Sequence, residues 1–262
     1  MLNDSSKEPA QQKPAKRYAW NPFAALLIVI GSFLIVPTVV QIVLSFVPSI
    51  LGWDEARAHE WATDMPIANF LFVLLTEILT VAVVYAFVHR KKIAFRVAAA
   101  LGKPKLRDVG YAILGILIYF GLFTVVYMVV TSVIHIDTDQ KQALGFEQGV
   151  SGAGLWMAFF SLVILPPIAE EIMFRGFFYG TLRNNRFKKW PAILVTTTLF
   201  ASLHLFGAAS GGLLWAAFVD VFTLSVVLCY LREETGTIWA SMGVHALKNG
   251  FVFINLFLIH GH

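Results

Sequence analysis

Seven apolar segments dominate this chain, and each is suited to hydrocarbon rather than to water. They run over residues 22–47, 66–88, 109–133, 155–179, 190–206, 213–231 and 238–259. A bilayer core about 30 Å thick is crossed by roughly 20 apolar helical residues, so each segment is a candidate span, with 190–206 the shortest. The sequence therefore predicts an all-α, polytopic transmembrane helical bundle with seven spans. A re-entrant piece around residues 208–217 would raise the count to eight.

The composition supports the same fold class. Hydrophobic residues make up 58% of the chain and charged residues only 14%. A soluble domain carries about a quarter charged residues and has too little interior to hide so many apolar side chains. A single cysteine, Cys229, excludes an internal disulfide and argues against a thiolate metal site.

The basic residues predict the orientation of the bundle. Sixteen of the twenty fall on one side of the predicted membrane: Lys7, Lys13, Lys16, Arg17, Arg90, Lys91, Lys92, Arg96, Lys103, Lys105, Arg107, Arg183, Arg186, Lys188, Lys189 and Arg232. Because Lys and Arg concentrate in cytoplasmic loops, we expect the N-terminus in the cytoplasm and the C-terminus outside a cell (plasma) membrane. Residues 1–20 are expected to be a disordered cytoplasmic tail, and 21–262 a single transmembrane domain.

The same distribution bears on binding partners. The basic residues follow the ends of the spans instead of forming one stripe, which argues against a nucleic acid. The formal charge of +4 is expected to face anionic lipid headgroups.

Ionisable groups inside the spans are the chemically informative residues: Glu77, Glu170, Glu171, Arg175, His204, Asp220, His245 and Lys248. Left unpaired, the acids and permanent bases among them would cost on the order of 15–20 kcal/mol. Glu171 and Arg175 are four residues apart and are predicted to form a charge pair, while Glu170 points about 100° away and stays free. Lys248 is predicted to bridge to Asp220 or Glu77.

Four polar residues are predicted to meet near mid-membrane. Counted from the basic ends of their spans at ~1.5 Å per residue, Glu170, His204, His245 and Asn249 lie at similar depths. Pro166, with Pro167 beside it, should loosen the fourth span and open space for water. A partly dry carboxylate beside an imidazole can deprotonate water. A second imidazole and an amide can stabilise an oxyanion, so the pattern indicates hydrolysis by a catalytic core at about 155–249.

Three motifs also carry a family resemblance. They are the sequences EEIMFR at 170–175, FASLH at 200–204 and HALKN at 245–249. In this order they resemble the signature of the CAAX-protease and bacteriocin-processing (CPBP, or Abi) family of intramembrane proteases, which includes the Ras-converting CAAX endoprotease. The segment TGTIW at 235–239 also looks like the family's lead-in to the last motif.

The resemblance implies a CAAX-type intramembrane endopeptidase acting on a membrane-associated, prenylated or lipid-like peptide. It implies that Glu170 and His204 activate the attacking water and that His245 and Asn249 form the oxyanion site. Glu171 with Arg175 would orient Glu170. The sequence departs from the family at Leu224 and Ser225, where family members often carry glycine.

Three alternatives remain open at this stage. Glu170, His204 and His245 could hold a zinc ion with Glu171 as the base, and such proteins are often labelled metalloproteases. No HExxH motif is present, and we favour a mechanism without a cofactor. A non-catalytic bacteriocin-immunity or scaffold protein is the second alternative. A transporter is the third, because transporters also keep charges inside the membrane.

Overall fold

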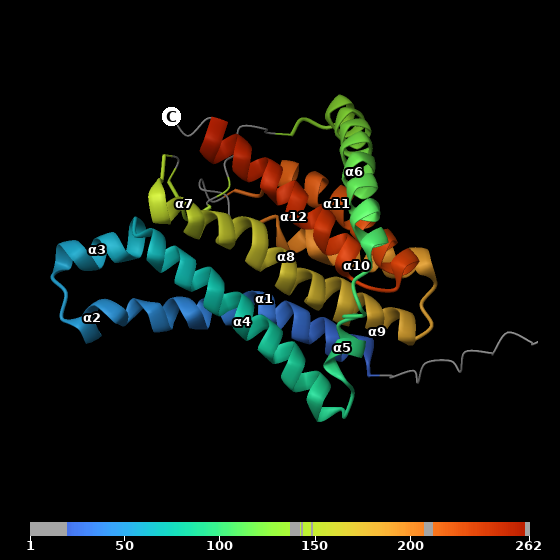
Figure 1. Ribbon diagram of the computed structural model, residues 1–262, viewed down its shortest axis with the longest axis horizontal. Helices are drawn as coiled ribbons and strands as arrows, with labels where there is room; N and C mark the ends of the chain where they lie inside the picture. Colours follow the sequence, from blue (N-terminus) through green and yellow to red (C-terminus); the bar gives the residue numbers. More distant parts are fainter. Residues whose placement is uncertain (1–19, 137–141, 143, 148, 207–211, 260–262) are drawn as a thin grey trace, which may run out of the picture.

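The computed structural model describes residues 20–136, 142, 144–147, 149–206 and 212–259, and helices account for most of them (Figure 1). The helices are α1 Pro22–Ser45, α2 Val47–Leu51, α3 Glu55–Thr63, α4 Pro66–Arg90, α5 Phe95–Ala98, α6 Leu106–Val133, α7 Gly152–Phe159, η1 Phe160–Ile164, α8 Leu165–Glu170, η2 Glu171–Phe178, α9 Tyr179–Asn184, α10 Lys189–Leu203, α11 Trp215–Thr235, α12 Trp239–Phe253 and η3 Ile254–Ile259. The predicted all-α bundle is confirmed.

The number of spans differs from the prediction. Six helical stretches in the described ranges are long and apolar enough to cross a membrane. The predicted fifth span is α10, whose 15 residues cover only about 22 Å and fall short of a bilayer core. The count of seven is therefore not confirmed. Of the predicted re-entrant piece, residues 208–211 lie outside the described residues, and residues 215–217 belong to the start of α11. The N-terminal tail, residues 1–19, also lies outside the described residues.

Sequence signals explain where the spans begin and end. Pro22 and Pro66 open α1 and α4, at positions where a missing N–H is harmless. The Asn21 side chain accepts a hydrogen bond from the Phe23 N–H at 2.8 Å and so caps α1. Helix α11 is followed by Gly236, whose φ of 76° is the left-handed conformation that favours glycine at a helix C-terminus.

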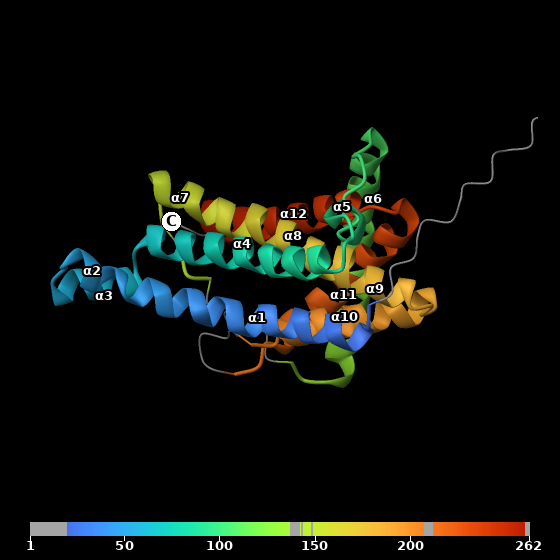
Figure 2. The same cartoon turned by 90° about the horizontal axis from the view of Figure 1, so that it is seen from below.

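The bundle has two chemically different ends. α1 begins, and α4, α9 and α11 end, at the end that also carries α5, whereas α2, α3 and α7 lie at the opposite end (Figures 1 and 2). The helix ends and loops at the α5 end hold the basic residues from Arg90 to Arg107, from Arg183 to Lys189, and Arg232. We call this the basic end. Which side of the membrane it faces stays a prediction.

The fourth span, Gly152–Asn184, is a continuous column of α7, η1, α8, η2 and α9. Two of its pieces, η1 and η2, are wide π-helical turns. The loosening predicted around Pro166 and Pro167 is therefore present, because neither proline can donate to the preceding turn. In η2 every residue is buried.

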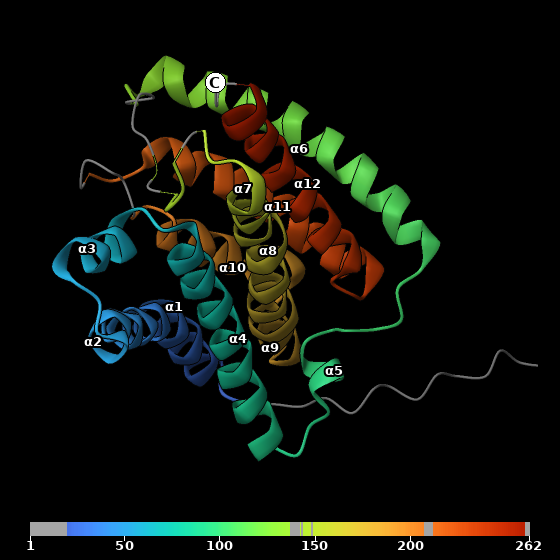
Figure 3. The same cartoon turned by 60° about the vertical axis from the view of Figure 1, so that its left-hand side comes forward.

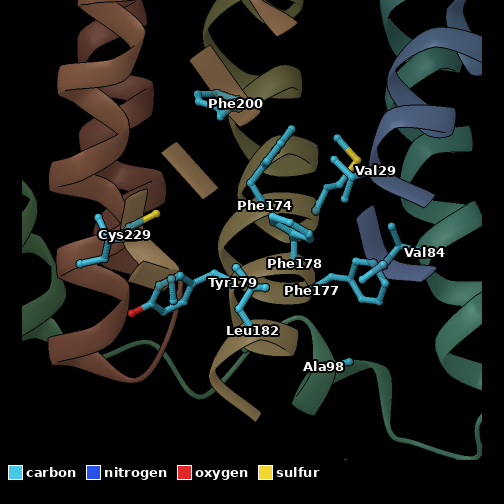
Figure 4. Close-up of a cluster of buried hydrophobic side chains, with 14 of the residues drawn as sticks. Val29, Val84, Ala98, Phe174, Phe177, Phe178, Tyr179, Leu182, Phe200 and Cys229 are labelled. Atoms are coloured by element: carbon cyan, nitrogen blue, oxygen red, sulfur yellow. The ribbon is translucent and has the colours of Figure 1, made fainter. Parts of the chain in front are cut away.

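This column stands at the centre of the bundle. It contacts α1 and α4 on one side and α10, α11 and α12 on the other (Figure 3). Phe174, Phe177, Phe178 and Tyr179 extend from it and are almost completely buried (Figure 4). Such a packed centre fixes the rotation of the helix that carries the adjacent glutamates.

Candidate active site

A charge pair is completely buried within the central column. Arg175 Nη1 lies 2.8 Å from Glu171 Oε1, and both side chains are inaccessible to solvent. Arg175 Nη2 donates to Ser225 Oγ at 2.7 Å, and the guanidinium lies over the Phe200 ring, 4.3 Å from its centroid. The pairing predicted from the four-residue spacing is confirmed. Ser225, one of the departures from the family pattern, is a partner that the sequence did not reveal.

The same pair sets the orientation of His245. Its Nδ1 lies 3.2 Å from Glu171 Oε1, the oxygen that also accepts from Arg175. A carboxylate paired with a guanidinium accepts hydrogen bonds, so the proton in this contact belongs to Nδ1. His245 Nε2 then points toward Glu170, 3.6 Å from Oε2.

His204 approaches Glu170 from a different helix. It directly follows α10, and its Nδ1 donates to the Phe200 carbonyl at 2.8 Å, because a carbonyl can only accept. Nε2 is left with a free lone pair and lies 4.0 Å from Glu170 Oε1. That distance is too long for a hydrogen bond and suits one water molecule shared by the two groups.

Asn249 lies one turn along α12 from His245 and is bound on one side. Its Nδ2 donates to the Leu162 carbonyl at 3.0 Å. Pro166 is four residues after Leu162 and Pro167 five, so neither the α nor the π ladder can supply a donor to that carbonyl. An amide nitrogen carries two hydrogens, and the second stays available to the cavity that Asn249 lines.

The four predicted residues share one cavity of about 560 Å³. Glu170, His204, His245 and Asn249 all line it, so the convergence predicted from helical depth is confirmed. Its walls are mainly apolar, with aromatic side chains from α1, α4, α10, α12 and η3. A volume of this size accommodates a short peptide segment or a lipid-like group.

A second ion pair lies at the cavity wall. Lys248 Nζ is 2.7 Å from Asp220 Oδ2, and the Tyr119 hydroxyl donates to Asp220 Oδ1. The sequence predicted a bridge from Lys248 to Asp220 or Glu77, and the structure selects Asp220. Because Lys248 precedes Asn249, this bridge fixes the rotation of α12 at the site. Glu77 also lines the cavity, without a bond to Lys248.

The arrangement bears on the zinc hypothesis. Within the described residues, no group of three or more His, Cys, Asp or Glu side chains forms a metal-binding arrangement. His245 Nδ1 is engaged by Glu171, and Cys229 is buried in the core away from the cavity lining. The mechanism without zinc stays a prediction.

Comparison with known proteins adds a family to this geometry. Residues 152–251 match the family model described as type II CAAX prenyl endopeptidase Rce1-like. The match contains Glu170, Glu171, Arg175, His204, His245 and Asn249 and confirms the family resemblance of the three motifs. The chain is 26% identical over 247 residues to the uncharacterized protein YyaK of Bacillus subtilis (strain 168), a match that covers 89% of this chain and 76% of YyaK. No solved structure matches the chain significantly.

Proposed function

From the Rce1-like domain that residues 152–251 carry, we propose that this protein is a CAAX-type intramembrane endopeptidase. The observation that carries the proposal is the facing pair of Glu170 and His204, with 4.0 Å between Oε1 and Nε2 inside a cavity at mid-bundle. The reaction is hydrolysis of a peptide bond by activated water, without a covalent intermediate. The protein would be a multi-pass protein of the plasma membrane, with its N-terminus in the cytoplasm.

Glu170 and His204 activate the water. Glu170 Oε1 and His204 Nε2 both face the gap as hydrogen-bond acceptors. The only N–H of neutral His204 is on Nδ1, where it donates to the Phe200 carbonyl. A water in the gap donates one hydrogen to each acceptor and turns a lone pair toward the substrate carbonyl. As the water attacks, one acceptor takes a proton and passes it to the departing amide nitrogen. A positioned base of this kind typically raises the reaction rate by about 10²–10⁴-fold.

His245 and Asn249 stabilise the oxyanion. Asn249 offers its second amide hydrogen, while Leu162 holds the first. His245 has committed its Nδ1 proton to Glu171, so it donates from Nε2 only as an imidazolium. The carboxylates of Glu170 and Glu171 flank that ring and compensate its charge. One such donor is typically worth about 3 kcal/mol in the transition state.

The substrate is a membrane-associated peptide, with a prenylated or otherwise lipid-like segment in the apolar part of the cavity. The lining supplies aromatic and aliphatic walls around a few convergent polar groups, as small-molecule and cofactor sites commonly do. A hydrophobic anchor would bring the peptide bond to the depth of Glu170.

Terminal proteomics of membrane fractions tests the proposal. Cells carrying wild-type protein, Glu170→Gln, His204→Ala or the control Glu60→Gln are compared for protein termini. Glu60 is an exposed carboxylate on α3, so its replacement matches the chemistry without touching the cavity. We expect a cleaved terminus in wild type and Glu60→Gln that is absent from both site variants, at equal protein levels and thermal stability. Unchanged termini across all four strains would instead favour the immunity or scaffold hypothesis.

Metal analysis tests the cofactor. We propose that the purified protein is active without zinc and keeps its activity after treatment with a chelator. Zinc at about one ion per chain, together with activity that is lost on chelation and regained on adding zinc, would replace the water mechanism with the Glu170, His204 and His245 site.

A further inference from the structure

Glu77 is a carboxylate of the cavity that the proposed reaction does not use. It lies on α4, lines the same cavity as Glu170, and is half-buried. None of the hydrogen bonds and ion pairs found among the described residues involves the Glu77 side chain.

The basic side chains nearest the cavity already have acidic partners within the protein. Lys248 is held by Asp220, which also accepts from Tyr119. Arg175 is held by Glu171 and Ser225, outside the cavity lining. A half-buried carboxylate in a mainly apolar cavity is only partly solvated, and Glu77 has no ion-pair partner among the described residues, so a cationic group that enters the cavity can form a favourable charge pair with it.

The cavity extends toward the end of the bundle opposite the basic loops. Gln142, Leu144 and Phe206 line it, and all three lie in connections at that end. The surface there is acidic. Among the described residues at that end, one side chain is basic, Arg57, and five are acidic: Asp54, Glu55, Glu60, Asp64 and Glu147. When the charges around the entrance of a cleft have one sign, they raise the local concentration of oppositely charged ligands. A positively charged segment is therefore favoured on this route.

We propose that Glu77 binds a basic side chain, Lys or Arg, of the substrate peptide. The cavity thus selects peptides that combine an apolar segment with a basic residue near the scissile bond and enter from the end opposite the basic loops. If those loops are cytoplasmic, the peptide comes from the outer side of the membrane. This inference rests on the proposed function and names the substrate class of the same site.

Cleavage of matched peptides provides the test. Short fluorogenic apolar peptides, acetylated at the N-terminus, carry at each position in turn Lys, Glu, or norleucine, which keeps the stem of Lys without its charge. For wild-type protein in nanodiscs we expect kcat/KM to be about tenfold or more higher for Lys than for norleucine at one position, the scale of a partly desolvated charge pair. In Glu77→Gln the ratio should fall to about one, and in Glu77→Lys the Glu peptide should become the preferred substrate. Glu234→Gln changes an exposed carboxylate at the basic end, away from the entry route, and is the control that should keep the wild-type ratio.

Two outcomes overturn the inference: equal kcat/KM for Lys and norleucine at every position, or a Lys preference that survives Glu77→Gln. Thermal unfolding identifies a variant that has lost its fold, and the reversed preference of Glu77→Lys is a result that damage alone cannot produce.

Binding to Glu170→Ala separates this inference from the proposed function. If wild-type protein cleaves none of the peptides, the proposed function fails. Tighter binding of the Lys peptide to Glu170→Ala than to Glu170→Ala/Glu77→Gln would still establish the subsite.

Discussion

The side-chain amide of Asn249 is bonded to the Leu162 carbonyl over 3.0 Å. That carbonyl has no donor from its own helix, because Pro166 and Pro167 occupy the positions that would supply one. The contact therefore joins α12 to the loosened fourth span beside Glu170. It also gives Asn249 two separable tasks: one hydrogen holds the helices together, and the other faces the cavity.

The two tasks of Asn249 can be separated by mutation. Asn249→Ala leaves the Leu162 carbonyl unpaired, so we expect a loss of about 1–3 kcal/mol in the free energy of unfolding, together with a large fall in kcat. Adding Pro166→Ala restores an N–H four residues after Leu162. The double variant should recover part of the stability, measured by thermal unfolding in detergent, but none of the activity. Recovery of activity as well would show that Asn249 acts only through structure.

The buried Glu171–Arg175 pair should dominate the stability of the central column. Arg175→Met leaves Glu171 charged in a solvent-free site, and removing one partner of such a pair typically costs about 3–5 kcal/mol. Ser225→Ala is the matched control, because it removes only one hydrogen bond from the guanidinium and should cost about 1 kcal/mol. Tryptophan fluorescence during thermal unfolding measures both. Similar losses in the two variants would contradict this ranking.

Lys248 should act on the site through its bridge to Asp220. Lys248→Met leaves Asp220 with Tyr119 alone, and we expect a stability loss of about 2–4 kcal/mol, since the pair is mostly buried. Activity should fall with it, because the rotation of α12 is no longer fixed. Replacing both partners, as in Lys248→Met with Asp220→Leu, should be less harmful than Lys248→Met. Full activity and stability in Lys248→Met would refute the positioning role.

Gly176 should tolerate no side chain. A Cβ there would lie 2.5 Å from the carbonyl oxygen of Ala99, in the segment that follows α5. Backbone is not displaced easily, so we expect Gly176→Ala to lower the free energy of unfolding by about 1–3 kcal/mol. Gly121→Ala, in an open position of α6, is the control and should be neutral or slightly stabilising. Equal thermal stability of the two variants would show that the segment after α5 moves freely.

Local spacing predicted part of the candidate site well. The Glu171–Arg175 pair needed only the helical repeat, and the shared depth of Glu170, His204 and His245 needed only the rise per residue. The choice of Asp220 over Glu77 for Lys248 was beyond such reasoning, because it depends on how α4 and α11 rotate against α12. The Leu162 contact of Asn249 was also missed. Its signal was present in the sequence, in the prolines four and five residues after Leu162.

The sequence by itself determined the class of the molecule. Its long apolar segments leave no option but helices that satisfy their own backbone, and the charges kept within them had to be paired or functional. Only the tertiary structure decided that α10 is too short to count as a span and that Lys248 pairs with Asp220. It also showed that Glu77 lines the cavity without an ion-pair partner among the described residues. The physical reason is range: hydropathy and helical repeat act within one segment, whereas the rotation and depth of each helix are set by packing against segments far away in the chain.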